Sequence, residues 1–326
     1  MYKLSVIIPI FGVEKYIERC IHSLLQQTLD QIEFIFVDDC SKDNSINILN
    51  ETIKKYPNRI KDIKIVRTPF NNGLPQARKF GLQYATGDYI IHCDSDDWIE
   101  LNMYETLYRE AIQNNLDIVS CDYYESTEDS DIIFTAKGNT TTPERYLSDI
   151  ISLNIAVSVW NKLIKRTLYE EKLIHPTQNM GEDLVLIIQL IFRSKRIGHI
   201  NKPLYHYYSN PNSISKEKSE EATIKKWKAI NENIQLIEKI LKNSGIGDKY
   251  SKELIALKEN SRKHILKPLI YKSKIRSIWI NSFPEINLSK SNSIKNNILY
   301  ILIYSRIYLI FVLLINIAHY IKKNIK

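Results

Sequence analysis

The chain has 326 residues, of which 44% are apolar and 25% are charged. This composition excludes a fibrous or disordered protein and allows one large domain with an accessory region. The four cysteines form no CxxC pair and show no zinc-ligand spacing, so they predict small buried side chains in a reducing compartment. Because the first residues run directly into an apolar strand, we expect no signal peptide and a cytoplasmic location.

Strands and helices alternate along the first 121 residues. Apolar runs predict strands at 4–9, 33–38, 63–67, 88–93 and 117–121. Helical spacing, capping residues and glycine stops predict helices at 14–27, 46–53, 73–84 and 102–114. This alternation predicts right-handed crossovers and an α/β fold with a mostly parallel, doubly wound sheet flanked by helices.

The second half of the chain is less regular. Thr142 followed by Pro143 predicts a helix start, and Gly181 precedes an apolar helix that runs to Phe192. Two aromatic segments predict short strands, at 160–163 and 204–208. Lys- and Glu-rich amphipathic helices are expected from residue 216 to about residue 270.

The net charge of +8 is concentrated near the C-terminal end. Residues 1–215 carry 23 Lys and Arg against 28 Asp and Glu, whereas residues 216–326 carry 22 against 9. Within the basic region, 18 of the 21 residues at 298–318 are apolar, which is just long enough to span a bilayer. Arg306 near the middle would cost about 3 kcal/mol on insertion scales, so an interfacial helix fits better than a span or a buried core helix. We therefore expect 297–326 to associate with the membrane.

Three carboxylates follow the predicted strand at 88–93 within four residues: Asp94, Asp96 and Asp97. Like charges this close repel one another unless a cation lies among them. Carboxylate oxygens suit Mg²⁺ or Mn²⁺, and these ions usually complete their shell with substrate phosphates. Taken alone, the cluster has an alternative explanation as an acidic loop or a helix N-cap.

Polar residues also follow two other predicted strands, at 9–11 and 38–39. Ligands of a doubly wound sheet bind beyond the carboxyl ends of its strands. We therefore expect these residues and the acidic cluster to meet in one crevice.

The chain resembles the family 2 glycosyltransferases of GT-A fold, especially bacterial members that build capsules, lipooligosaccharides and teichoic-type polymers. The resemblance covers roughly residues 3–215. Five ordered segments carry it: Ser5–Phe11, Ile21–Thr28, Val37–Asp43 with Cys40 where glycine is usual, Asn72–Arg78, and Gly87–Asp97 with the DxD motif.

The resemblance implies a nucleotide-sugar donor, most simply a UDP-sugar, and a Mn²⁺ or Mg²⁺ cofactor. Asp96 would be the direct metal ligand, and Asp94 would face the metal or the ribose. The other implied donor-binding residues are Pro9 and Phe11 at the base pocket, Asp39 on the base, Arg78 near the diphosphate, and Ser95. The alternatives are a core position for Phe11, a turn-stabilising role for Asp39 and an exposed helical position for Arg78.

Inverting transfer needs a base that takes a proton from the acceptor hydroxyl. The segment Gly181-Glu182-Asp183 resembles the family's ED motif, in which Asp183 would be the base and Glu182 would position the acceptor. Acidic residues in the first turn of a helix are the alternative, because the helix dipole favours them there. Further candidates for the site are Asp97, Trp160, Lys162 and His206, although a lone histidine among tyrosines is more often structural.

These features predict three regions. They are a catalytic domain at 1–215, with a nucleotide-binding half at 1–100 and an acceptor half at 101–215, a basic helical extension at 216–296, and the membrane-associating helix at 297–326.

The predicted activity is metal-dependent, inverting transfer of a sugar from a nucleotide-sugar to a glycan or lipid-linked acceptor in cell-surface polysaccharide synthesis. The enzyme would lie at the inner face of the cell membrane, either peripheral or tail-anchored. The alternatives are a nucleotidyltransferase of similar fold and an inactive membrane-bound scaffold. We expect no nucleic-acid partner, because the basic residues accompany an apolar segment and no recognition motif.

Overall fold

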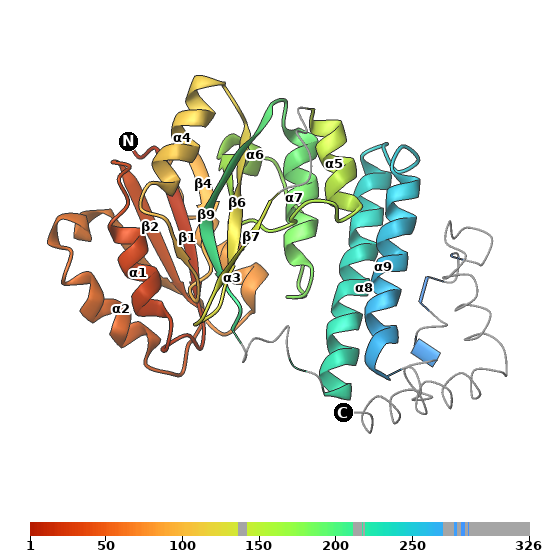
Figure 1. Ribbon diagram of the computed structural model, residues 1–326, viewed down its shortest axis with the longest axis horizontal. Helices are drawn as coiled ribbons and strands as arrows, with labels where there is room; N and C mark the ends of the chain where they lie inside the picture. Colours follow the sequence, from red (N-terminus) through yellow and green to blue (C-terminus); the bar gives the residue numbers. More distant parts are fainter. Residues whose placement is uncertain are drawn as a thin grey trace.

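A computed structural model of the chain describes residues 1–135, 142–210, 217, 219–269, 277–278, 282–283 and 286. Its centre is one nine-stranded sheet in the order β3-β2-β1-β4-β8-β6-β9-β5, with β7 paired to β6 (Figure 1). The strands are β1 Leu4–Ile10, β2 Ile32–Asp38, β3 Ile63–Arg67, β4 Tyr89–His92, β5 Trp98–Ile99, β6 Ile118–Ser126, β7 Asp131–Phe134, β8 Lys162–Lys165 and β9 Ile197–Tyr208. The helices are α1 Ile17–Leu25, α2 Ser45–Ile53, η1 Pro57–Asp62 (a 3₁₀ helix), α3 Leu74–Leu82, α4 Met103–Gln113, α5 Pro143–Ile151, α6 Thr167–Glu170, α7 Glu182–Arg193, α8 Glu220–Asn243 and α9 Ser251–Leu269.

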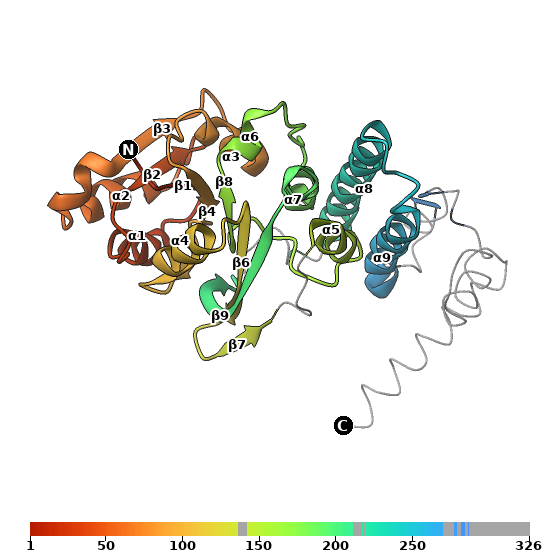
Figure 2. The same cartoon turned by 90° about the horizontal axis from the view of Figure 1, so that it is seen from above.

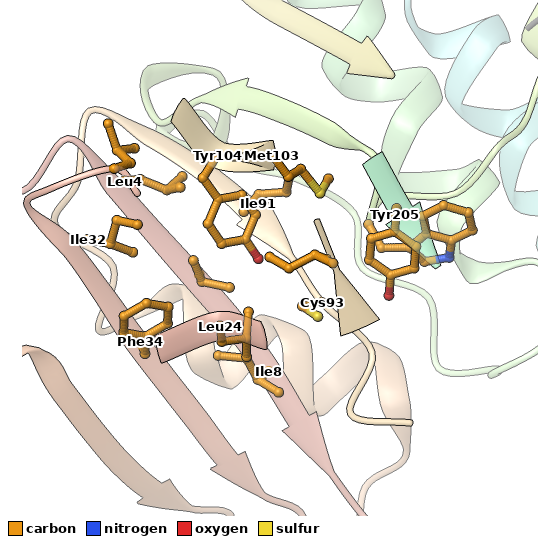
Figure 3. Packing of buried hydrophobic residues seen from close by; sticks show 14 of the residues in the cluster. Leu4, Ile8, Leu24, Ile32, Phe34, Ile91, Cys93, Met103, Tyr104 and Tyr205 are labelled. Carbon is orange, nitrogen blue, oxygen red and sulfur yellow. The ribbon is translucent and has the colours of Figure 1, made fainter. Parts of the chain in front are cut away.

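The first half of the sheet, β3-β2-β1-β4, is parallel throughout. Every residue of β1, β2 and β4 is buried, because helices cover both faces of these strands. Figure 2 shows α1 and α4 on one side of this half and α3 and α6 on the other. Side chains of α1 and α4 form one core with these strands; Figure 3 shows Leu24, Tyr104 and Phe34 in it. On the other face, Gly81 of α3 lies so close to β1 and β2 that a side chain there would collide with Ile7 and Val37.

The second half corrects the expectation of a mostly parallel sheet. β8 is antiparallel to both β4 and β6, and β5 is antiparallel to β9, so the sheet as a whole is mixed. The predicted strand at 160–163 is observed as β8 two residues later, after Trp160 and Asn161. β6 and β9 run far beyond the predicted segments at 117–121 and 204–208, and they pair in parallel through a β-bulge around Asp122. The bulge inserts extra residues and increases the local twist, which a strict alternation pattern does not reveal.

α5, α7, α8 and α9 share a second core beside this half of the sheet. The predicted N-cap is confirmed, because the Thr142 side chain accepts a hydrogen bond from the Arg145 amide at the start of α5. α8 and α9 lie side by side at the far end from β3, within the predicted helical extension (Figures 1 and 2). In the part of the chain that the structure describes, no helix has both the length and the apolar character needed to cross a bilayer. The predicted membrane-associating segment lies outside that part.

Candidate active site

The loop after β4 places the predicted acidic motif at the carboxyl edge of the sheet. The Cys93 amide donates to the Ile7 carbonyl oxygen, which holds the loop beside β1. Buried Ser95 donates from its hydroxyl to the Pro9 carbonyl oxygen at 2.7 Å. These bonds fix the loop to the end of β1 and leave Asp94 and Asp96 partly exposed. The carboxyl ends of β1 and β4 therefore lie side by side, as expected.

Arg78 of α3 is the centre of the site. Its side chain is 2% exposed, and its Nη2 lies 2.6 Å from Oδ1 of Asp94. Its Nη1 lies 2.5 Å from Oδ1 of Asp183 and also contacts Glu182. Burial lowers the pKa of Arg78, but the charges of Asp183 and Asp94 outweigh it and raise the pKa above its ordinary value. One buried cation thus joins the DxD motif to the ED motif, although the two lie almost 90 residues apart.

Three contacts position the loop that precedes α7. The Gln76 side chain of α3 donates to the Pro176 carbonyl oxygen at 2.8 Å. Gly73, at φ +80°, lies against the Asn179 side chain so closely that a Cβ would be 2.5 Å from its oxygen. From α8, the buried Asn233 amide donates to the carbonyl oxygens of Gln178 and Met180. α8 therefore supports the loop that leads to Glu182 and Asp183 at the start of α7, a contact that no local sequence pattern indicates.

The surroundings of Asp96 disfavour its charged form. Burial, and then the charge of Asp94, raise the pKa of Asp96 to about 6. No group of three His, Cys, Asp or Glu side chains within the described ranges is placed to hold a metal ion by itself. Two carboxylates that lack a full protein shell fit Mg²⁺ or Mn²⁺, because these ions take their remaining ligands from water and substrate phosphates.

Asp97, a further candidate, is placed as an anchor for β9. Its side chain is buried and accepts hydrogen bonds from the Tyr205 hydroxyl at 2.6 Å and from the Tyr208 amide at 2.7 Å. Burial, together with the charges of Asp96 and Asp94, raises the pKa of Asp97. In the described chain, these contacts tie Asp97 to the fold.

Phe11 and Asp39, the two residues predicted to contact the nucleobase, lie in different surroundings. Phe11 follows β1 and is 51% exposed, so its ring is available at the edge and is not the core residue of the alternative interpretation. Asp39 is buried, and its carboxylate accepts from the Thr68 hydroxyl at 2.8 Å and from the amides of Asn72 and Gly73. These are the contacts of a turn-stabilising aspartate, and they position the start of α3. A role of Asp39 on the base stays a prediction.

Trp160 and Lys162 lie in the interior of the second half of the sheet. The Trp160 ring stacks on Tyr205 with a centroid separation of 4.2 Å. Lys162 is buried, and its Nζ donates to the carbonyl oxygens of Ala156 and Ser158 and to Oδ1 of Asn161. Burial lowers the pKa of Lys162 to about 7, although the charge of Asp183 acts in the opposite direction. Lys162 therefore fastens the loop at 156–161.

His206 lies between two rings, with centroids 4.7 Å from Trp98 and 4.5 Å from Tyr124. Its Nε2 faces Glu100 at 2.9 Å and its Nδ1 faces Ser126 at 3.1 Å. Both ring nitrogens thus have structural partners, so the predicted contact with metal or diphosphate has no support from this geometry.

Arg19 is a site residue that the sequence analysis missed. Its guanidinium lies 3.5 Å from the Trp98 ring centroid, and it donates to the Asp96 carbonyl oxygen at 3.3 Å. An exposed arginine on an amphipathic helix gives no sequence signal of such a contact.

Sequence comparisons identify the family. The model of the family described as "Glycosyl transferase family 2" matches residues 5–174. Glycosyltransferase GlyG of Streptococcus pneumoniae is 31% identical over 224 residues, which cover 65% of this chain and 72% of GlyG. The uncharacterized glycosyltransferase EpsJ of Bacillus subtilis is 34% identical over 220 residues, which cover 65% of this chain and 62% of EpsJ. The chain thus spans about three fifths of EpsJ, and it spans 34% of a third relative, glycosyltransferase GlyA of S. pneumoniae.

Solved structures support the fold. The chain superimposes on S. aureus TarS 1-349 in complex with UDP-GlcNAc with a TM-score of 0.67 and 20% identity, over 88% of this chain and 82% of that one. It superimposes on the mannosyltransferase PcManGT from Pyrobaculum calidifontis, in complex with GDP-Man and Mn²⁺, with a TM-score of 0.52 and 14% identity, over 85% and 78% of the two chains. The curled, mixed sheet is consistent with the GT-A fold of the predicted family. The resemblance seen in the five sequence segments is therefore confirmed, and the chain belongs to glycosyl transferase family 2.

Proposed function

We propose that the chain transfers a sugar from a UDP-sugar to a glycan or lipid-linked acceptor, with inversion at the anomeric carbon and with a divalent metal. One observation carries this proposal: Arg78 holds Asp183 and Asp94 on the same guanidinium. A candidate base and a candidate metal ligand thereby share one edge of the sheet. The TarS structures bound to UDP and to UDP-GlcNAc support the choice of donor class.

The chemistry assigns a separate task to each group. Asp183 takes the proton from the acceptor hydroxyl as that oxygen bonds to the anomeric carbon. The bond from this carbon to the β-phosphate oxygen breaks, and the nucleoside diphosphate leaves with the electron pair. Arg78 orients the Asp183 carboxylate through its Nη1, and Phe11 offers its exposed ring to the base. Asp96 and Asp94 would hold Mg²⁺ or Mn²⁺, which offsets the charge that develops on the departing diphosphate.

The cellular role is part of the same proposal. One relative, the minor teichoic acid biosynthesis protein GgaB of Bacillus subtilis, is 30% identical over 221 residues, which cover 63% of this chain and 23% of GgaB. Its name supports a role in cell-surface polymer synthesis. We place the reaction at the inner face of the membrane because the basic, apolar segment 297–326 would hold the enzyme beside lipid-linked acceptors.

Donor hydrolysis tests the reaction class. The purified chain is incubated with UDP-, GDP-, CDP- and dTDP-sugars, and nucleotide release is measured with Mn²⁺ or with EDTA. We expect release from a UDP-sugar that requires metal and is lost in Asp96→Ala. Asp183→Asn should keep nucleotide binding but lower transfer by about 10²–10⁴-fold, which is the usual contribution of a general base. If neither release nor calorimetric binding of any nucleoside diphosphate occurs with Mn²⁺, the chain is instead a scaffold.

A further inference from the structure

A hollow of about 400 Å³ opens where β6, the end of β7 and the segment after α5 meet. Its lining comes from three parts of the chain: Tyr123 of β6, Phe134 at the end of β7, and the segment from Leu153 to Asn161. Its volume lies in the range of small-molecule sites. None of the residues assigned above to the donor, the metal or the base lines it.

Two chains of contacts run from this hollow toward the carboxyl edge of the sheet. Tyr123 packs edge-on against Trp160, whose other neighbour, Tyr205, bonds to Asp97. Asn161 accepts a hydrogen bond from Lys162, the first residue of β8. Because β8 is antiparallel to both β4 and β6, Asn161 lies at the same edge of the sheet as the loop after β4.

The backbone conformation and the exposure of Leu153 are both unfavourable for stability. It has a φ of +59°, a left-handed conformation that is unfavourable for a bulky side chain. It is also 41% exposed and lines the hollow. Glycine is the usual residue at such a position after a helix, since it adopts this conformation without strain. Strain of this kind concentrates at functional sites, which makes the exposed side chain of Leu153 a candidate contact for a ligand.

The hollow also presents an aromatic ring. Phe134 stacks on Tyr123 with a centroid separation of 5.3 Å and an interplanar angle of 10°, and it remains 39% exposed. Asn154 and Thr135 add polar groups to the same lining. An acyl chain would use only the apolar surface, whereas a saccharide has both C–H faces and hydroxyls to match this mixture.

We propose that the hollow binds a non-reacting sugar unit of the acceptor saccharide, with Phe134 and Leu153 contacting its C–H face. This inference rests on the proposed function, because it assigns the acceptor class of that same reaction. The hollow fixes the acceptor chain, while Asp183 acts on the hydroxyl that reacts.

The test uses the full chain with Mn²⁺ and UDP on a printed array of oligosaccharides. The same saccharides are then offered as acceptors together with the nucleotide-sugar that the release assay identifies as the donor. Sugar transfer and donor hydrolysis are measured separately. We expect the wild type to bind at least one saccharide. In Phe134→Ala and Leu153→Gly, binding and the ratio of transfer to hydrolysis should each fall by roughly tenfold or more. Leu153→Gly should also raise Tm because the strain is removed, so lost folding cannot explain its effect. Ile112→Ala, which removes an even more exposed apolar side chain (54%) from α4, is the control and should behave as wild type.

Three results would overturn the inference. They are no saccharide bound by the wild type, unchanged binding in both variants, and variant-sensitive binding to vesicles containing polyprenyl phosphate but to no saccharide. Failure of the proposed function looks different, because the wild type would then release no nucleotide from any donor, whatever the array shows.

Discussion

The loops that follow β2 and β4 have similar acidic sequences but very different structures. After β2, carboxylates accept hydrogen bonds from backbone amides: Asp38 from Ser41, Asp39 from Asn72 and Gly73, and Asp43 from Glu14 and Ser45. After β4, only Asp97 has a backbone amide of another segment as its partner. Asp94 instead contacts a buried guanidinium, and burial raises the pKa of Asp96 to about 6. These contacts are those of the residues that the structure describes in each loop.

The comparison shows that the supply of donors decides what a carboxylate does. A carboxylate surrounded by N–H groups is stabilised as a structural anion, and it holds a turn. A carboxylate without such donors keeps its affinity for a cation, whether that is a metal ion or an arginine. The predictions below test this difference between the two loops.

Removal of Arg78 should have the largest effect. Arg78→Ala leaves Asp94, Glu182 and Asp183 crowded without their cation, and we expect a loss of about 3–5 kcal/mol in the free energy of unfolding. Urea denaturation measures it. The matched control is Arg67→Ala, since Arg67 is an exposed partner of Asp38 in the β2 loop and should cost less than about 1 kcal/mol. Equal losses in the two variants would contradict the distinction between the loops.

Within the β4 loop, Asp97 and Asp96 should respond in opposite ways. Asp97→Ala leaves the Tyr205 hydroxyl and the Tyr208 amide without their acceptor, which should cost about 2–4 kcal/mol of stability. Asp96→Ala should cost no stability in EDTA, because it removes a charge that the fold disfavours, yet it should abolish metal-dependent donor release. Thermal unfolding and the release assay separate the two effects. A stable Asp97→Ala protein would show that Asp97 is not the anchor described here.

The pH dependence of stability should also distinguish the loops. A carboxyl whose folded pKa is about 6 stays protonated in the fold while the unfolded chain ionises near pH 4. In EDTA, Asp96 should therefore lower the free energy of unfolding as pH rises from about 4 to about 6, by at most about 1.4 kcal/mol per pH unit. The hydrogen bonds of Asp43 outweigh its burial and lower its pKa, so Asp43 contributes the opposite trend at lower pH. Urea unfolding of Asp96→Asn across this range should show a smaller decline than the wild type, because the raised pKa of Asp97 contributes to the same trend. An unchanged pH profile would refute the assignment.

The sequence predicted the edge of the sheet and the family, because both depend on motifs that are local in the chain. Two local segments were sufficient for both predictions: the apolar run at 88–93 with the acids that follow it, and the segment from Gly181 to Asp183. The partner of each acid was not predictable. Arg78 lies 105 residues from Asp183, and only the packing of α3 beside the loop before α7 brings the two together.

The roles of Asp39 and His206 show the same limit. The motif places Asp39 at the correct edge, but Asn72 and Gly73 decide which atoms its carboxylate contacts. For His206, Glu100 and Ser126 occupy the two ring nitrogens. The mixed half of the sheet was also missed, since the bulge in β6 and the short edge strand β7 interrupt the apolar periodicity on which strand prediction depends.

The smallest effect concerns Cys40 in the β2 loop, where the family usually has glycine. Cys40 has a φ of +59°, and its thiol donates only a weak bond to the Thr68 carbonyl oxygen at 3.3 Å. Cys40→Gly should relieve backbone strain and stabilise the protein by about 0.5–1 kcal/mol, measured as a rise in the urea midpoint. Cys40→Ala keeps the strained backbone and loses the thiol, so it should give no gain. Asp39, the residue before Cys40, accepts hydrogen bonds from the Asn72 and Gly73 amides. If only Cys40→Gly gains stability, these hydrogen bonds hold the loop in a conformation that strains the backbone of residue 40. A gain in both variants would mean that the thiol, and not the backbone, is the unfavourable element.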